Sequence, residues 1–138
     1  MKVQTYVTFN GRCEEALALY KKAVGAKVTG LIRWKESLDK DMKGPPGYEE
    51  KIMNAAFLIG ETQLMADDGM GDKTAEFKGM TPVIEVADDL EAKRVFTALG
   101  EGGKVTMPLM KTFWTSSFGM LTDKFCVPWM VNVAMSNA

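Results

Sequence analysis

Alternating apolar and polar positions predict strands over most of the chain, and two stretches with a helical period interrupt them. Residues 2–9 (KVQTYVTF) alternate with a period of two, which is typical of a strand with one face on a core. The apolar positions of residues 12–24 instead follow a helical spacing, at Ala16, Leu19, Tyr20 and Ala23. Gly25 follows at the position where a glycine commonly ends a helix.

The same patterns predict the remaining elements. A second helix is expected at residues 90–99, and Asp88 and Asp89 can cap its start. Two polar stretches rich in glycine, 37–50 and 67–78, are predicted to be loops. Further strands are predicted at residues 26–34, 51–59, 62–66, 80–86, 104–110, 112–121 and 127–134.

The predicted elements occur twice in the same order. The second helix repeats the apolar positions of the first, each 76 residues later, at Ala92, Val95, Phe96 and Leu99. GAKVT at 25–29 and GGKVT at 102–106 follow the two helices. We therefore predict an α+β fold of two tandem βαβββ modules, about 1–68 and 79–138, joined by a loop in a single domain. Together the modules would form a curved, incompletely closed mixed sheet with a concave face.

Composition and charge narrow the function classes. The chain is 46% hydrophobic and 25% charged with a net charge of −1, which does not favour nucleic acid or an anionic membrane as partner. No apolar run is long enough to span a bilayer, and the N-terminal residues lack a signal-peptide core. We expect a cytoplasmic protein whose two cysteines, Cys13 and Cys126, are reduced.

Two extremes of composition bear on chemistry. The chain has no histidine, so acid–base work would fall to Asp, Glu, Lys, Tyr or Cys. It has 11 methionines, a residue that fills irregular apolar space and lines adaptable pockets. We interpret most of these methionines as core filling.

Several segments carry a resemblance to a known family. They are YVTFNGRC at 6–13 with Glu15, Ala16 and Tyr20; LMAD at 64–67; Phe113, Trp114, Phe118 and Gly119; and TDKFCVPWMVN at 122–132. With the paired modules, these residues resemble the vicinal oxygen chelate superfamily of glyoxalase I and the bleomycin-resistance proteins. Within it the chain is similar to the PhnB-like, or 3-demethylubiquinone methyltransferase-like, subfamily. Cys126 stands where relatives usually have glycine, so it must tolerate the backbone angles of that turn.

The resemblance implies a metal site that this sequence does not match. The superfamily usually takes one metal ligand each from its first, fourth, fifth and eighth strands. These positions fall near Gln4, Met65, Thr81 and Met130, none of which is His, Asp or Glu. Amide and thioether groups do not suit the metals of this superfamily. We therefore predict no metal and no cofactor.

The concave face is the predicted ligand site. The residues expected to line it are Gln4, Tyr6, Met65, Thr81, Trp114, Met130 and Asn132. The same residues could instead close a core or a dimer interface, and the sequence leaves both open. Glu85 is the best carboxylate for a catalytic base if it is buried there; the alternative is an exposed or paired glutamate at a strand end.

Other reactive residues have structural explanations. Cys13 lies in the first helical turn, where a thiolate is stabilised, but a buried structural cysteine is favoured. Asp67 and Asp68 are interpreted as a solvated loop, and Asp123 as shaping its turn through its own backbone. Trp129 is expected to pack on a helix.

Three functions stay open. The first is a PhnB-like protein that binds a small organic molecule without a metal. The second is a metal-dependent lyase, isomerase or dioxygenase of the same superfamily, and the third is a resistance protein that sequesters a planar drug. The resemblance also implies a homodimer, since the superfamily often builds its cavity from modules of two chains. The sequence decides neither the ligand nor whether a reaction is catalysed.

Overall fold

The structure, a computed structural model, describes residues 1–71 and 76–134. It divides the chain into two compact units, Met1–Ala75 and Glu76–Ala138. In the described residues, none of the helices has the length and apolar character needed to cross a membrane. Each unit is described in turn below.

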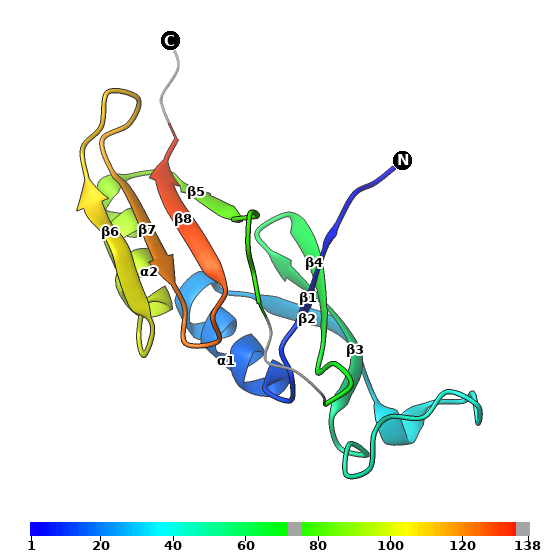
Figure 1. The fold of residues 1–138 in the computed structure, drawn as a ribbon. Helices are drawn as coiled ribbons and strands as arrows, with labels where there is room; N and C mark the ends of the chain where they lie inside the picture. Colours follow the sequence, from blue (N-terminus) through cyan, green and yellow to red (C-terminus); the bar gives the residue numbers. More distant parts are fainter. Residues whose placement is uncertain (72–75, 135–138) are drawn as a thin grey trace. The chain divides into compact units, whose positions relative to one another are not determined.

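The first unit is a four-stranded mixed sheet with one α-helix (Figure 1). Its strand order is β1-β4-β3-β2, in which β1 runs parallel to β4 and the other neighbours are antiparallel. In chain order its elements are β1 (Thr5–Thr8), α1 (Cys13–Val24), β2 (Lys27–Arg33), the 3-10 helix η1 (Trp34–Glu36), β3 (Ile52–Ile59) and β4 (Thr62–Asp67).

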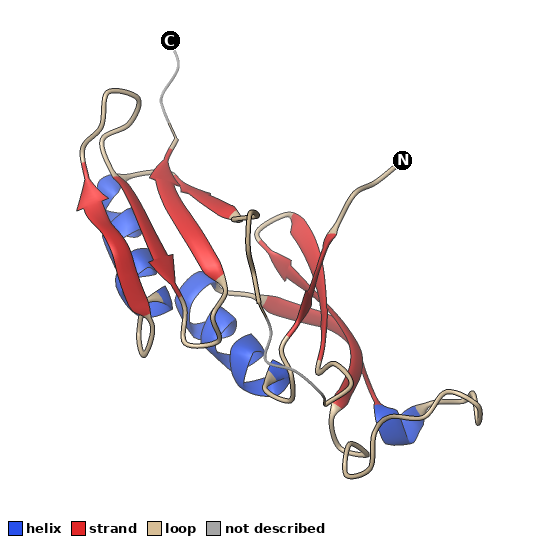
Figure 2. Ribbon diagram, viewed as in Figure 1, coloured by secondary structure: helices blue, strands red, loops and turns tan. Residues whose placement is uncertain are grey.

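The second unit repeats this topology. Its strand order is β5-β8-β7-β6, with β5 parallel to β8, and α2 lies against one face of the sheet (Figure 2). Its elements are β5 (Val83–Val86), α2 (Asp89–Leu99), β6 (Lys104–Met110), β7 (Phe118–Thr122) and β8 (Pro128–Val133). The predicted α+β class and the tandem βαβββ order are confirmed, as two four-stranded mixed sheets that are not closed into a barrel.

Some predicted boundaries were wrong. The strands β1 and β5 begin at Thr5 and Val83, three residues later than the alternation suggested. Residues 112–117 form a loop rather than the first half of a strand, because Thr112 N donates to Thr115 O and turns the chain. Part of the predicted loop at 67–78 lies outside the described residues.

One face of each sheet packs on the helix of its own unit. In β8 every second residue is buried, and Trp129, Val131 and Val133 form the side that faces α2, as predicted for Trp129. In the first unit Tyr20 of α1 stacks on Phe57 of β3 with ring centroids 6.2 Å apart. This alternation leaves the opposite face of each sheet without a helix of its own unit.

The two helices differ in how their first turns are capped. Gly25 ends α1 in the left-handed conformation, with φ of 66°, as the sequence predicted. Asp88 caps α2 by accepting a hydrogen bond from Glu91 N at 2.8 Å. Arg12, at the corresponding place in α1, makes no side-chain cap, so the first turn of that helix needs an acceptor from elsewhere.

That acceptor is Asp68, and its interpretation as loop solvation was wrong. The side chain is 1% exposed. Its carboxylate accepts hydrogen bonds from Cys13 N at 2.7 Å and Ile52 N at 2.6 Å. The residue after β4 therefore ties the start of α1 to the start of β3.

Candidate functional site

The face of the second sheet opposite α2, here called the open face of the second sheet, presents two rows of four side chains and a third, shorter row of Pro128, Thr122 and Lys104. The rows follow from the ladder register, because residues directly opposite each other point to the same side. The first row crosses the sheet through Glu85, Asn132, Phe118 and Met110. The second row crosses it through Val83, Met130, Met120 and Met107.

Trp114 lies beside the first row, although it belongs to the loop between β6 and β7. Its Nε1 donates a hydrogen bond to Asn132 Oδ1 at 3.2 Å. Its ring packs edge-to-face on Phe118, with centroids 5.2 Å apart, and on Phe113, with centroids 5.0 Å apart. Three aromatic rings therefore gather next to one polar side chain.

The loop that carries Trp114 is tied to the start of α2. The hydroxyls of Ser116 and Ser117 both donate to Asp89 Oδ1, at 2.5 and 2.8 Å. These bonds hold the pKa of Asp89 below its usual value, because they favour the ionised carboxylate. The carboxylate at the first position of α2 thus fixes the end of the aromatic loop.

Glu85, the predicted catalytic base, lies in the first row on the edge strand β5. Its side chain is exposed, so the burial that would favour a role as base is not seen. In the described part of the chain its carboxylate makes neither an ion pair nor a side-chain hydrogen bond. A catalytic role for Glu85 stays a prediction.

The methionines do not fill the core. Of the ten methionines among residues 1–71 and 76–134, none is buried. Met107, Met110, Met120 and Met130 instead lie in the two rows of the open face. Our interpretation of most methionines as core filling was wrong, because leucine, valine, phenylalanine and alanine occupy the helix-facing positions.

The face of the first sheet opposite α1 is here called the open face of the first sheet. Its central row ends in small residues. Tyr6, Met65, Ala56 and Gly30 lie opposite one another across the four strands. Tyr6 donates its hydroxyl to Asp67 Oδ2 at 3.0 Å. Partial burial, followed by the negative charge of Asp67, raises the pKa of Tyr6 to about 12.

The structure distributes the predicted ligand-binding residues over the two units. Tyr6 and Met65 lie side by side on the first open face, and Gln4, just before β1, accepts a hydrogen bond from Gln63 Nε2 at 3.3 Å. In the second unit, Met130 and Asn132 lie on the open face, and Trp114 is hydrogen bonded to Asn132. Thr81 precedes β5 by two residues and is not in the sheet.

The four positions that the resemblance assigned to a metal do not supply a suitable donor set. Gln4, Met65, Thr81 and Met130 offer an amide, two thioethers and a hydroxyl. Within residues 1–71 and 76–134, no group of three or more Cys, Asp or Glu side chains could hold a metal ion. The residues present do not fit the metal of the superfamily.

Two structural interpretations are confirmed. Cys13 is fully buried, and burial together with the carboxylates of Asp68 and Asp67 raises the pKa of its thiol well above the ordinary range. Asp123 is buried in the β7–β8 turn and accepts from Phe125 N and Val127 N. In the same turn, Cys126 adopts a φ of 72°, as its place at a glycine position required.

The sequence did not single out Phe118 or the methionines of β6 and β7 as site residues. Phe118 lies opposite Asn132, and Met120 lies opposite Met130, so the register of the final hairpin brings them to the predicted site. Extending the alternation of β8 to its hairpin partner would have identified both. The bulges in β6 between Val105 and Met110 hid the other two methionines, because they shift the period of that strand.

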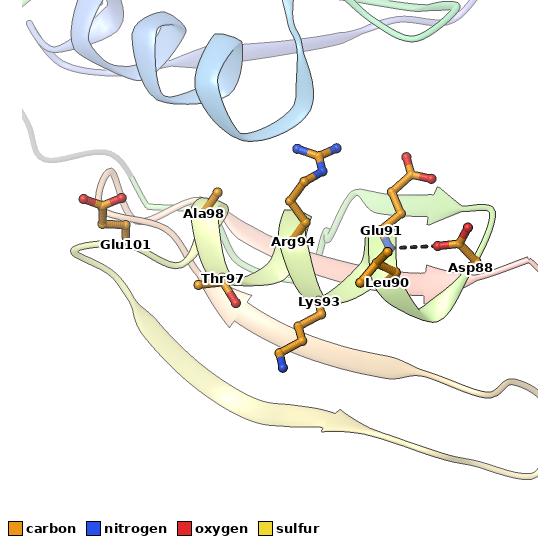
Figure 3. A pocket seen from close by; sticks show the side chains of 8 residues that line it. All are labelled: Asp88, Leu90, Glu91, Lys93, Arg94, Thr97, Ala98 and Glu101. Atoms are coloured by element: carbon orange, nitrogen blue, oxygen red, sulfur yellow. Dashed lines mark hydrogen bonds between the residues drawn. The ribbon is translucent and has the colours of Figure 1, made fainter.

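A hollow on α2 is a weaker candidate. Leu90, one of its lining residues, is 81% exposed. Figure 3 shows that all its lining residues come from α2 and the residues next to its ends: Asp88, Leu90, Glu91, Lys93, Arg94, Thr97, Ala98 and Glu101. The surface of a single helix is convex and does not enclose a ligand, so we place the candidate site on the sheet.

Comparison with known proteins gives one family over nearly the whole chain. The family model described as 3-demethylubiquinone-9 3-methyltransferase matches residues 1–132. Protein YjdN of Escherichia coli (strain K12) is 34% identical over 140 residues, which cover 96% of this chain and 95% of YjdN.

Solved structures agree with this family. Protein PA1353 from Pseudomonas aeruginosa has 38% identity and a TM-score of 0.85, with 96% of this chain and 97% of that chain covered. A PhnB protein from Bacillus cereus has 26% identity and a TM-score of 0.81, with 97% and 100% covered. A glyoxylase/bleomycin resistance protein/dioxygenase domain from Frankia sp. EAN1pec shares the fold, with 12% identity, a TM-score of 0.65, and 100% and 95% covered. The predicted superfamily fold and PhnB-like resemblance are confirmed.

Proposed function

Because the chain belongs to the 3-demethylubiquinone-9 3-methyltransferase family of PhnB-like proteins, we propose that it binds a small organic molecule on the open face of the second sheet. The observation that carries the proposal is the indole of Trp114, hydrogen bonded to Asn132 and packed on Phe118. This arrangement fixes an aromatic surface beside two apolar rows. It is the combination of apolar area and few polar anchors that small-molecule sites use.

The exposure of these side chains supports the proposal. Phe113 is 95% exposed and Trp114 is 39% exposed, so the aromatic loop leaves a large apolar area in water. Burying such area against a ligand is favourable by about 25 cal/mol per Å². Contiguous exposed apolar surface of this kind commonly marks a binding site. Methionine side chains in the same rows adapt their shape to a ligand at little cost.

The proposed binding does not use the metal of the wider superfamily. The donor set at the four transferred positions does not suit such a metal, as described above. Orientation of the ligand would instead come from Asn132 and Glu85, the polar members of the first row. Gln4, Tyr6 and Met65 of the first unit stay candidates on their own sheet.

Methyl transfer, the reaction in the family's name, would need a site for a methyl donor in addition to this face. The proposal concerns binding alone, and the methyl donor enters its test as a probe. Uniform ¹⁵N labelling allows the indole N–H of Trp114 to be followed by NMR after assignment with Trp114→Phe. The compounds to be tested form a panel of planar aromatic compounds, soluble quinones and S-adenosylmethionine.

We expect at least one planar compound to shift the Trp114 indole signal. Trp114→Ala, followed through the side-chain amide of Asn132, should weaken its binding about tenfold or more, because a central aromatic anchor contributes about 2 kcal/mol. The matched control is Leu90→Ala, which removes an exposed apolar side chain from α2 in the same unit. Binding lost through Leu90→Ala but not Trp114→Ala would place the site on α2, and a silent panel would contradict the proposal.

A second measurement addresses the metal. Elemental analysis of the purified protein should show no stoichiometric transition metal. Near-stoichiometric zinc, nickel, manganese or iron that binds in a Met65→Ala or Met130→Ala variant as well would show that other residues hold it. That result would contradict the metal-free part of the proposal while leaving the binding face intact.

A further inference from the structure

The charge on the open face of the second sheet defines the class of its ligand; this inference rests on the proposed function. Of the eight residues in the two rows, Glu85 is the one with a charged side chain. Its exposed carboxylate has no ion pair or side-chain hydrogen bond within the described residues. The two rows therefore offer one unpaired negative charge; the positive charge on the same side of the sheet, Lys104, lies in the third row beside Thr122.

The two lysines at the ends of β6 lie away from the Glu85 carboxylate. Lys104 and Lys111 stand at the two ends of β6, which is separated from β5 by β8 and β7. Three strand spacings place β6 about 14 Å from β5. A carboxylate and an ammonium at that separation are largely screened from each other by solvent.

Next to Glu85, the donors of Trp114 and Asn132 are largely in use. Trp114 Nε1 donates to Asn132 Oδ1, and Asn132 Nδ2 donates to Val133 O at 3.2 Å. The amide keeps one N–H that a ligand could reach, against the full acceptor capacity of the Glu85 carboxylate. This surplus of acceptors disfavours an anionic ligand and favours one that donates hydrogen bonds.

The aromatic rings also favour a positively charged ligand. Trp114 packs edge-to-face with both Phe113 and Phe118, and Phe113 and Trp114 remain exposed, so aromatic surface of the group is accessible to a ligand. An indole face attracts a cation within about 6 Å, more strongly than the other aromatic side chains do. Phe118 lies two strands from Glu85, a lateral distance of about 10 Å. A ligand of a few carbon atoms can span the carboxylate and the rings.

We propose that the ligand of the open face of the second sheet is an organic cation, an ammonium group carried on an apolar or aromatic body. The ammonium lies against Glu85 and the indole of Trp114, and the body lies on the methionines of the second row. A glutamate on an edge strand can also serve only to prevent sheet extension, and the experiment below separates the two roles.

The test compares three compounds of similar size that differ in charge: the cation 2-phenylethylammonium, the neutral 2-phenylethanol and the anion 3-phenylpropanoate. Binding is followed at pH 7 through the Trp114 indole N–H. We expect the ammonium to bind about tenfold more tightly than the alcohol, and the carboxylate to bind most weakly. Glu85→Gln should bring the ammonium and the alcohol within about twofold of each other.

Glu91→Gln is the matched control, since it removes the same charge from α2, on the opposite side of the sheet. It should keep the tenfold preference. Equal binding of ammonium and alcohol to the unaltered protein overturns the cationic ligand, and a full tenfold preference that survives Glu85→Gln overturns the assignment of Glu85 as its partner. If the three compounds fail while the wider panel yields an uncharged ligand, the cation is wrong and the proposed function stands. If neither set binds, both proposals fail.

Discussion

The two units share one topology, but their buried carboxylates lie at different places in it. In the first unit Asp68 follows β4 and joins the start of α1 to β3. In the second unit Asp123 lies in the β7–β8 turn, and α2 is capped locally by Asp88. A helix without its own cap needs an acceptor from the sheet, whereas a capped helix leaves that role free. The duplication therefore kept the topology and exchanged the polar contacts that support it.

The faces of the sheets have diverged to different extents. Against the helices, Tyr20 of α1 stacks on a second ring, Phe57, whereas Phe96 of α2 lies over Gly119. On the open faces, Tyr6 lies opposite Met65 in the first sheet, whereas Glu85 lies opposite Asn132 in the second. Packing limits change on the helix side, while the open faces are free to acquire different chemistry.

Replacing Asp123 should have the largest effect on stability. Asp123→Ala leaves Phe125 N, Val127 N and Trp129 Nε1 without this acceptor. Unpaired buried donors cost about 1 to 3 kcal/mol each, so we expect a loss of about 4 kcal/mol in the free energy of unfolding by denaturant titration. Asp41→Ala, in an exposed loop of the first unit, should change it by less than about 0.5 kcal/mol. Equal effects of the two variants would show that the carboxylate is not structural.

Asp68→Ala should cost less, about 3 kcal/mol, because its carboxylate accepts from two amides. The loss should also be local. Hydrogen exchange at the Cys13 and Ile52 amides should accelerate more than at Phe125, with the reverse order in Asp123→Ala. Equal acceleration at both sites would contradict the separate roles of the two carboxylates.

The strands and helices of both units could be predicted from periodicity, but the ends of the strands could not. Alternation continues through residues 2–4 and 80–82, so the sequence shows no signal for the later starts of β1 and β5. Residues 112–117 resemble a strand in composition, yet their backbone turns at Thr112 and Thr115. Propensity reports which residues suit a strand and not which backbone groups find a partner.

The candidate site was predictable where it depends on a single strand. Alternation placed Met130 and Asn132 on one face. It could not place Asp68 in the core, because the donors to this carboxylate lie 55 and 16 residues away in the sequence. The hydrogen bonds from Ser116 and Ser117 to Asp89 are hidden for the same reason. Such contacts depend on tertiary structure, which a local pattern does not encode.

The packing of Phe96 over Gly119 in the second unit can be tested by adding a methyl group at Gly119. A Cβ at this position would lie 2.7 Å from Phe96 Cε1 and 3.0 Å from Leu109 Cδ2. Gly119→Ala should therefore lower the free energy of unfolding by about 2 kcal/mol through overpacking. The matched control is Gly30→Ala in β2, where no atom lies within 4 Å of the added methyl group. It should be neutral or slightly stabilising. In a Phe96→Leu background the cost of Gly119→Ala should fall, and an unchanged cost would show that Phe96 is not the cause.

The smallest expected effect concerns the tether of the aromatic loop, which has no counterpart among the hydrogen bonds described for the first unit. The pKa of Asp89 is lowered in the folded protein by the hydroxyls of Ser116 and Ser117. A lowered pKa means that the tether is complete above the unfolded value of about 3.9 and is lost as pH falls through the folded value. The amide signal of Ser117 should therefore shift below about pH 3.9, and the Trp114 indole signal should follow it.

Asp89→Ala should abolish this transition and shift both signals at pH 7 toward their acid positions. Because Asp89 is exposed, we expect little change in global stability. Glu85→Gln serves as the control, since it removes the carboxylate of the first row and should leave the transition in place. A transition that disappears with Glu85→Gln and survives Asp89→Ala would show that the aromatic loop responds to the charge of the open face rather than to its tether on α2.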